Sequence, residues 1–212
     1  MNNFTIVELN GVASIDVSTG ADINDALAAL DVYILGSATA TSGVVNVTAS
    51  TSFSTTIVAQ DNIALNLNAG VTLTLDSAIV GSAYDLSGTQ SAGLTGTGTL
   101  DAAGNTDTAV LGDAAKDPFI GNVGSTDPSP DSLTIVGWKY GVVIASTATE
   151  AATDIVVENL QISGPAAIDV IYPFWITSRP ALNGPQVEGL VVTNLLACWK
   201  GCKPRISVQM TL

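Results

Sequence analysis

LTIVGWKYGVVI at 133–144, IVVENLQISGPAAIDVI at 155–171 and LVVTNLLACWKGCKPRISV at 190–208 are three versions of one pattern. Each has a β-branched strand, a Gly or Asn corner, a short turn and a second apolar strand. The starts are 22 and 35 residues apart, so a unit of about one solenoid coil recurs, with an insertion before the third unit. Stacked units give each strand a partner above and below. The pattern predicts a parallel β-solenoid.

Length and composition agree with this fold. The 212 residues suffice for one elongated domain, and we expect a single domain over 1–212. Charged residues make up 12% and apolar residues 47% of the chain, and Ser, Thr, Gly and Asn fill much of the rest. This mixture suits tightly stacked strands and is typical of neither a disordered chain nor a helical bundle.

The chain carries no signal for membrane insertion or secretion. The longest uncharged run, 32–60, has Gly, Ser and Thr throughout, so it contains no block of apolar residues long enough to cross a bilayer. The start, MNNFTIVELNG, lacks a basic segment followed by an apolar one. We expect a protein made in the cytoplasm without a signal peptide.

Charge is unevenly distributed along the chain. The formal net charge is −13, and no Lys or Arg precedes Lys116, while Lys200, Lys203 and Arg205 crowd the C-terminal end. Such a charge argues against nucleic acid as a partner, because phosphate binding needs cations. We interpret the acidity as a solubility adaptation, with an acidic face for a basic partner as the alternative.

The N-terminal segment predicts a capped solenoid end. Residues 1–20 alternate as one or two strands, and Asp22 is expected to be the N-cap of a helix over 21–36 that ends at Gly36. The helix has one apolar stripe, formed by Ile23, Ala26, Leu27, Leu30 and Ile34. The first coil of a solenoid exposes an apolar cross-section, and this helix would cover it.

Coils are expected over 43–212. Ile63, Leu65 and Leu67 alternate with polar residues, as do the residues of 71–75 after a turn. Two stretches rich in Pro and Gly, 112–132 and 172–187, predict loops that leave the coils.

The segments DINDALAALDVYIL, GVVNVTA, IALNLNAGVTLTL and GTGTLDAAG, in this order, resemble the start of the right-handed parallel β-helices of the pectate-lyase-like superfamily. The resemblance covers about 21–101, and GTGTLDAAG is its most specific part. It implies an all-β fold, a right-handed parallel β-helix with one N-terminal capping helix. The superfamily includes polygalacturonase-like glycosidases, polysaccharide lyases and bacteriophage tailspikes.

The catalytic motifs of polygalacturonase-like enzymes are mostly missing. An Asn-Thr-Asp segment is present at 105–107, but it follows the GTGTLD strand directly, so we interpret it as turn chemistry. The chain has no Asp-Asp pair and no His, and Arg205-Ile206-Ser207 lacks the Lys of the family motif.

A lyase-like site would need carboxylates for calcium and an arginine. Asp154, Glu158 and Asp169 with Arg179 could converge on one face, but strand-end charges that keep the coils soluble are the favoured interpretation. No cofactor, metal site or catalytic residue is predicted. Cys198 and Cys202 could form a small-loop disulfide or stay reduced as apolar fillers.

The predicted loop at 172–187 holds the candidate site. Tyr172, Phe174, Trp175 and Arg179 are residue types enriched at binding hot spots, and we consider a partner or glycan contact beside simple packing on the coil wall.

Together these features predict a structural, non-catalytic virion protein of a tailed bacteriophage: a capsid-decoration, fibre or spike subunit. It is expected to be a homotrimer that contacts other virion proteins and a host-surface glycan. The alternative is a polysaccharide-degrading glycosidase or lyase, or a receptor-binding tailspike. A third hypothesis is an ice- or surface-binding solenoid, suggested by the Thr72/Thr74 and Thr95/Thr97/Thr99 sets, although the sequence alone shows no regular Thr ranks.

Overall fold

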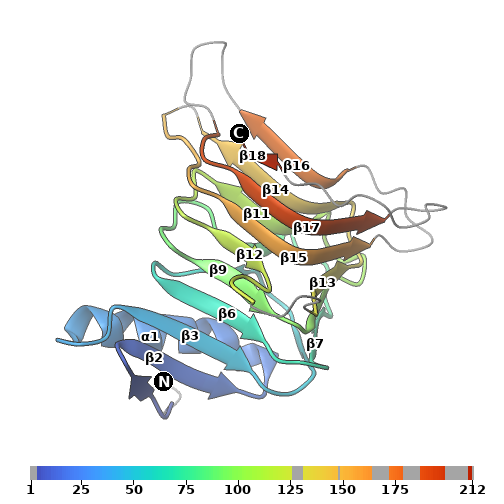
Figure 1. Cartoon of the computed structure of the whole chain (residues 1–212). Helices are drawn as coiled ribbons and strands as arrows, with labels where there is room; N and C mark the ends of the chain where they lie inside the picture. Colours follow the sequence, from blue (N-terminus) through green and yellow to red (C-terminus); the bar gives the residue numbers. More distant parts are fainter. Residues whose placement is uncertain are drawn as a thin grey trace.

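A computed structural model describes residues 4–125, 131–147, 149–163, 172–178, 187–198 and 210–211 (Figure 1). It contains a 3-10 turn η1 (Gly20–Asp22) and one helix, α1 (Ile23–Gly36). The strands are β1 (Val7–Leu9), β2 (Val12–Val17), β3 (Ser42–Val47), β4 (Thr51–Phe53), β5 (Ile57–Val58), β6 (Ile63–Leu67), β7 (Thr72–Leu75), β8 (Ser82–Asp85), β9 (Gly93–Gly96), β10 (Thr99–Asp101), β11 (Thr108–Asp113), β12 (Phe119–Gly121), β13 (Leu133–Val136), β14 (Tyr140–Ser146), β15 (Val156–Ser163), β16 (Tyr172–Ser178), β17 (Val191–Cys198) and β18 (Met210–Thr211). The fold is all-β and solenoid-like.

The strands form three faces. The first face stacks β2, β3, β6, β9, β12 and the first halves of β15 and β17. The second face stacks β4, β7, β10, β13 and the later half of β15, which bends between the two faces. The third face is a separate five-stranded sheet in the order β16-β14-β11-β8-β5. Every pair named here is parallel, and the chain climbs one coil with each circuit (Figure 1).

Inward side chains stack in columns along the core. On the first face one column is formed by Ile15, Val45, Leu65, Leu94, Ile120, Val157 and Val192. Each of these side chains is buried. Burial of one such side chain contributes about 1.5–3 kcal/mol, so these columns supply much of the stability that holds coil to coil. The described core residues form one cluster that extends from Ala13 to Leu195.

Polar side chains also repeat from coil to coil. Asn66 donates to Asn46, and Asn46 donates to Asp16, at 3.0 and 2.9 Å. Asn194 donates to Asn159 at 2.9 Å, and both have a left-handed backbone, with φ of 52° and 50°. Asparagine tolerates this conformation better than most residues, so it can turn the corner and bond its neighbour above or below.

Helix α1 covers the N-terminal end, as predicted. Ile23, Ala26, Leu27 and Leu30 face the core, and the helix lies behind β2 and β3 at the bottom of Figure 1. Asn24 binds the edge of β5: its Nδ2 donates to the Thr56 carbonyl at 3.0 Å, and its Oδ1 accepts from the Val58 amide at 3.0 Å. An amide side chain thus takes the place of a neighbouring strand at this edge.

Asp22 occupies the N-cap position of α1, as predicted, but its side chain does not cap the helix. The helix begins at Ile23 after the turn η1, and Asp22 makes no side-chain hydrogen bond to the helix start. Its Oδ2 accepts instead from the Thr19 hydroxyl at 2.6 Å. The 3-10 turn keeps Asp22 in the helical region of the backbone, whereas a capping residue is normally extended.

The predicted repeat is only partly in phase with the coils. Val156 pairs with Val191, so the 35-residue step is one coil. Leu133, however, pairs with Leu160 on the second face, and the 22-residue step joins two different faces. Short apolar strands followed by Gly or Asn corners occur on every face, so the pattern alone does not tell one face from another.

Both predicted loops contain strands that belong to the coils. The stretch 112–132 includes β12, which pairs with β9 and β15, and 172–187 includes β16, which pairs with β14. Pro118 precedes β12, where no ladder amide is needed, and its carbonyl accepts from the Val156 amide at 2.9 Å. Pro173 lies in the outermost strand of its sheet, and an edge strand tolerates proline.

Candidate functional site

The candidate site lies on the third face, where β16 contains three of the four predicted residues. The backbone of β16 pairs Phe174 with Val142 and Trp175 with Val143, and it pairs Tyr172 with Tyr140. Arg179 lies outside the described residues. The aromatic residues are therefore held by a regular strand rather than by a loop.

Neighbouring residues in β16 have different roles. Phe174 is partly buried and packs against the core, beside the buried Val142. Trp175 is half-buried and stacks on Tyr140, with ring centroids 5.7 Å apart and planes inclined by 29°. Phe174 therefore packs on the wall of the coil. Trp175 and Tyr140 instead form a stacked aromatic pair that keeps part of its surface in solvent.

An ion pair lies beside this aromatic pair. The Tyr140 amide donates to the Asp107 carbonyl at 2.7 Å, which fixes the start of β14 next to the start of β11. Lys139 Nζ lies 2.6 Å from Asp107 Oδ1, and this hydrogen bond raises the pKa of the Lys139 ammonium. Both side chains are largely exposed, so the pair adds little stability but places a fixed cation and anion beside the rings. We call Asp107, Lys139, Tyr140 and Trp175 the aromatic corner.

This arrangement suits binding by stacking. A stacked aromatic pair offers an apolar surface for the ring of a sugar or for an apolar side chain, and flanking charged groups can hydrogen-bond hydroxyls. Tyr140, Lys139 and Asp107 were not predicted from the sequence as members of this site. The segment GWKYG, with two aromatics and a lysine between glycines, was the available signal, but Trp138 of the same segment is fully buried in the core.

The structure describes only some of the residues of the lyase hypothesis. Asp154 has a left-handed backbone at a corner, and its amide donates to the Glu188 carbonyl at 2.9 Å. Glu158 Oε2 accepts from the Gly124 amide at 2.9 Å. Asp169 and Arg179 lie outside the described residues, as does Cys202 of the cysteine pair. Within the described ranges, no group of three or more Asp, Glu, Cys or His side chains could hold a metal ion.

The Asn-Thr-Asp segment holds a corner, as expected for turn chemistry. Asn105 Nδ2 donates to the Leu75 carbonyl at 2.8 Å, one coil below. The Thr106 hydroxyl donates to the Gly81 carbonyl, also on the coil below. Each side chain thus bonds a backbone carbonyl and ties this corner to the coil below.

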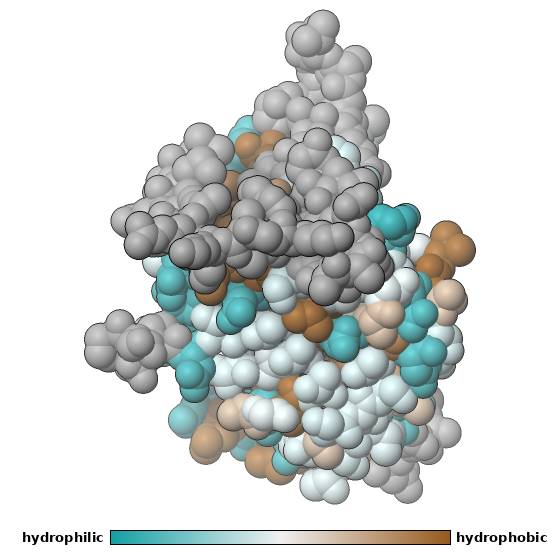
Figure 2. All heavy atoms as spheres, turned by 90° about the vertical axis from the view of Figure 1, so that its right-hand side faces the viewer, coloured by the Kyte–Doolittle hydropathy of each residue, from teal (hydrophilic) through white to brown (hydrophobic). Residues whose placement is uncertain are grey.

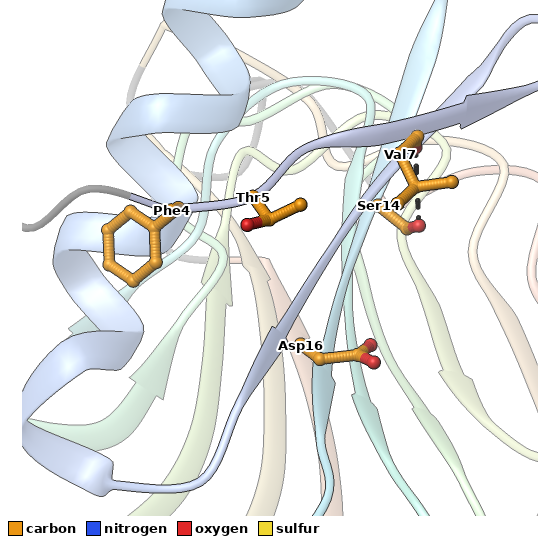
Figure 3. A pocket seen from close by; sticks show the side chains of 5 residues that line it. All are labelled: Phe4, Thr5, Val7, Ser14 and Asp16. Atoms are coloured by element: carbon orange, nitrogen blue, oxygen red, sulfur yellow. Dashed lines mark hydrogen bonds between the residues drawn. The ribbon is translucent and has the colours of Figure 1, made fainter.

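Three of the shallow depressions on the surface are lined by described residues. Figure 3 shows one of about 340 Å³, where Phe4, Thr5 and Val7 run past Ser14 and Asp16 of β2. The Ser14 hydroxyl donates to the Val7 carbonyl at 3.3 Å, and the ring of Phe4 lies beside the helix, apart from Asp16. The other two, of about 320 and 390 Å³, lie at the corner 104–107 and beside α1.

The second face aligns threonines that the sequence did not show in register. Thr72, Thr99 and Thr134 lie side by side on three successive coils, and Gln161 follows in the same row. The neighbouring row holds Thr74, Asp101 and Val136, so it is not a second threonine rank. The ice-binding hypothesis is therefore supported by one short row of threonines, but the described residues form no two-dimensional array of threonines on this face.

No helix of the described part is long and apolar enough to span a membrane. Comparisons with protein-family models, with curated proteins and with solved structures gave no match.

Proposed function

We propose that this chain is a right-handed parallel β-helix that serves as a structural, non-catalytic subunit of a tailed-bacteriophage particle. It would be a capsid-decoration, fibre or spike protein that assembles as a homotrimer among other virion proteins, with the aromatic corner as a contact for a host-surface glycan. The proposal is supported by the solenoid-like fold together with the resemblance of residues 21–101 to the pectate-lyase-like superfamily.

The observation that carries the structural role is how the carboxylates are used. Asp61, Asp85 and Asp101 each accept a hydrogen bond from a corner amide, those of Gln90, Ser87 and Ala103, at 2.9, 2.9 and 2.8 Å. In each case the carboxylate satisfies a backbone donor at a turn, and charge-assisted bonds of this kind are among the stronger ones. These three aspartates thus tie corners of the coils.

The second face supports lateral packing between copies. Figure 2 looks at the side of the solenoid where β7 and β13 lie, and much of the surface below the grey atoms is pale, neither strongly hydrophilic nor strongly hydrophobic. The threonine row of this face contributes to that character. A chain with a net charge of −13 packs against its copies most easily through a face with few charges.

A particle-level experiment tests the proposal. Mass spectrometry of purified phage particles that carry this gene should detect the chain in capsids or tails, in a constant ratio to the other structural proteins. Finding the chain only in the soluble fraction of infected cells would refute the virion role.

The alternative is a polysaccharide-degrading enzyme, and the stacked pair Tyr140–Trp175 beside Asp107 is the observation in its favour. Assays for reducing ends and for unsaturated products on bacterial surface polysaccharides separate the two. We expect no turnover. Turnover that is lost in Asp107→Asn or Asp154→Asn, with the fold intact, would establish the enzyme.

Glycan contact has its own test. Trp175→Ala should weaken retention of the chain on host polysaccharide by about twofold to tenfold, because a lost stacking contact costs about 0.5–1.5 kcal/mol. The matched control is Val32→Ala on α1, an exposed apolar side chain outside the aromatic corner. Equal retention of both variants would remove the aromatic corner from the proposal.

A further inference from the structure

The outer side of α1 is apolar, although the helix already buries its inner side. Val32 and Leu35 are 70% and 79% exposed, and Ala28 is exposed on the same side. The buried residues Ile23, Ala26, Leu27 and Leu30 form the opposite stripe. A helix that is apolar on both sides is normally covered on both.

Strand β1, the edge strand beside the helix, also exposes apolar side chains. Val7 and Leu9 of β1 are 58% and 71% exposed, while Glu8 between them turns toward α1 and accepts from the Tyr33 hydroxyl at 2.9 Å. Most of the exposed large apolar side chains of the described residues lie at the N-terminal end of the solenoid: Val7, Leu9, Val12, Val32, Leu35 and Val58, with Val80 and Val191 elsewhere. Side chains alternate along a strand, so Val7 and Leu9 face away from α1, and Val32 and Leu35 form a separate exposed apolar pair on the outer side of the helix. Exposed apolar side chains that lie close together favour an interaction.

The charges around this surface define its partner. Asp25 is exposed on α1, and Asp31 lines the depression of about 390 Å³ beside the helix, together with Leu35 and Asp61. No Lys or Arg precedes Lys116 in the sequence, and Lys116 follows Asp61 and Gln90 on the same corner, two coils away. An apolar surface bordered by carboxylates complements an apolar surface bordered by cations.

We propose that the outer side of α1, with the adjoining depression, docks a protein segment that presents apolar side chains flanked by Lys or Arg. The apolar side chains cover Val32 and Leu35, and a basic side chain enters the depression between Asp31 and Asp61. This inference goes beyond the virion proposal and stands independently of it, because it rests on the exposed residues of the solenoid end alone.

The test uses the full chain and a synthetic probe: a fluorescent 18-residue helical peptide with a leucine stripe flanked by lysines. Fluorescence anisotropy should show binding that the double variant Val32→Ser/Leu35→Ser weakens about tenfold or more. Asp31→Asn/Asp61→Asn should weaken it and reduce its salt dependence. Val80→Ser, an equal change at a fully exposed valine elsewhere, should leave it unchanged.

Three results would overturn the proposal. One is equal binding by Val80→Ser and by the α1 double variant, and another is equal binding of a matched peptide with glutamates in place of lysines. The third is dissociation of the protein into smaller species by the α1 double variant, since a second copy would then be the occupant. Circular dichroism confirms that each variant keeps its strands, and exposed sites such as these tolerate serine.

Discussion

Asn24 is the residue at which the capping role of α1 can be measured most sharply. Its side-chain amide bonds the Thr56 carbonyl and the Val58 amide, both at 3.0 Å, and so closes the lower edge of the third face. Asn24→Ala removes both bonds and leaves a strand edge with neither a neighbouring strand nor a side chain to pair it. The backbone of β5 then has only β8 as a partner.

The expected loss of stability follows from these two hydrogen bonds. A typical hydrogen bond contributes about 0.5–1.5 kcal/mol net, so the pair contributes about 1–3 kcal/mol. Alanine is the better helix former, which returns up to about 0.7 kcal/mol. We therefore expect the free energy of unfolding to fall by about 1–2 kcal/mol.

The assay combines urea denaturation with hydrogen exchange. Because a solenoid can open from one end, exchange of the Val58 amide reports the local edge directly, and it should become faster in Asn24→Ala. Asp25→Ala on the same helical turn is the control, since its side chain is exposed and lost helix-dipole stabilisation offsets gained propensity. An unchanged exchange rate at Val58, with stability within about 0.5 kcal/mol of the wild type, would refute this account of the cap.

Three further predictions concern the core and the N-terminal strand. Leu65→Ala, in the middle of the first-face column, should lower the free energy of unfolding by about 2–5 kcal/mol in denaturation experiments. Tyr84→Phe should cost about 1–2 kcal/mol, because the buried hydroxyl, whose pKa is raised by desolvation, donates to the Gly93 carbonyl at 2.9 Å. Hydrogen bonds from Thr39 and then from a tyrosine hydroxyl lower the pKa of Glu8, so its contribution is present above the ordinary glutamate pKa and is lost as pH falls through the lowered value. Acid titration of stability should therefore show a difference between wild type and Glu8→Gln that shrinks at low pH; a constant difference would contradict it.

Local patterns were sufficient to predict several elements. The stripe of Ile23, Ala26, Leu27 and Leu30 follows helical spacing, and the observed helix ends at Gly36 as expected. Leu65 and its neighbours alternate within one strand, so their inward orientation also follows from sequence. These features depend on residues close together in the chain.

Features that depend on how the coils stack could not be predicted from local sequence patterns. The partner of Leu133 is Leu160, because corner lengths differ from coil to coil and set which strands meet. The contact between Tyr140 and Trp175 arises from the same stacking of coils. Because of Pro173, the stretch that contains Trp175 was predicted as a loop and not as a strand. Proline indicates a loop locally, yet the edge position of β16 makes it acceptable.

The mass of the protein in solution tests the central proposal, a structural subunit that works by assembly, most directly. Sedimentation equilibrium of the purified chain should give the mass of three copies of 21.5 kDa. A stable single chain that releases sugar fragments from polysaccharide would contradict both the assembly and the non-catalytic role.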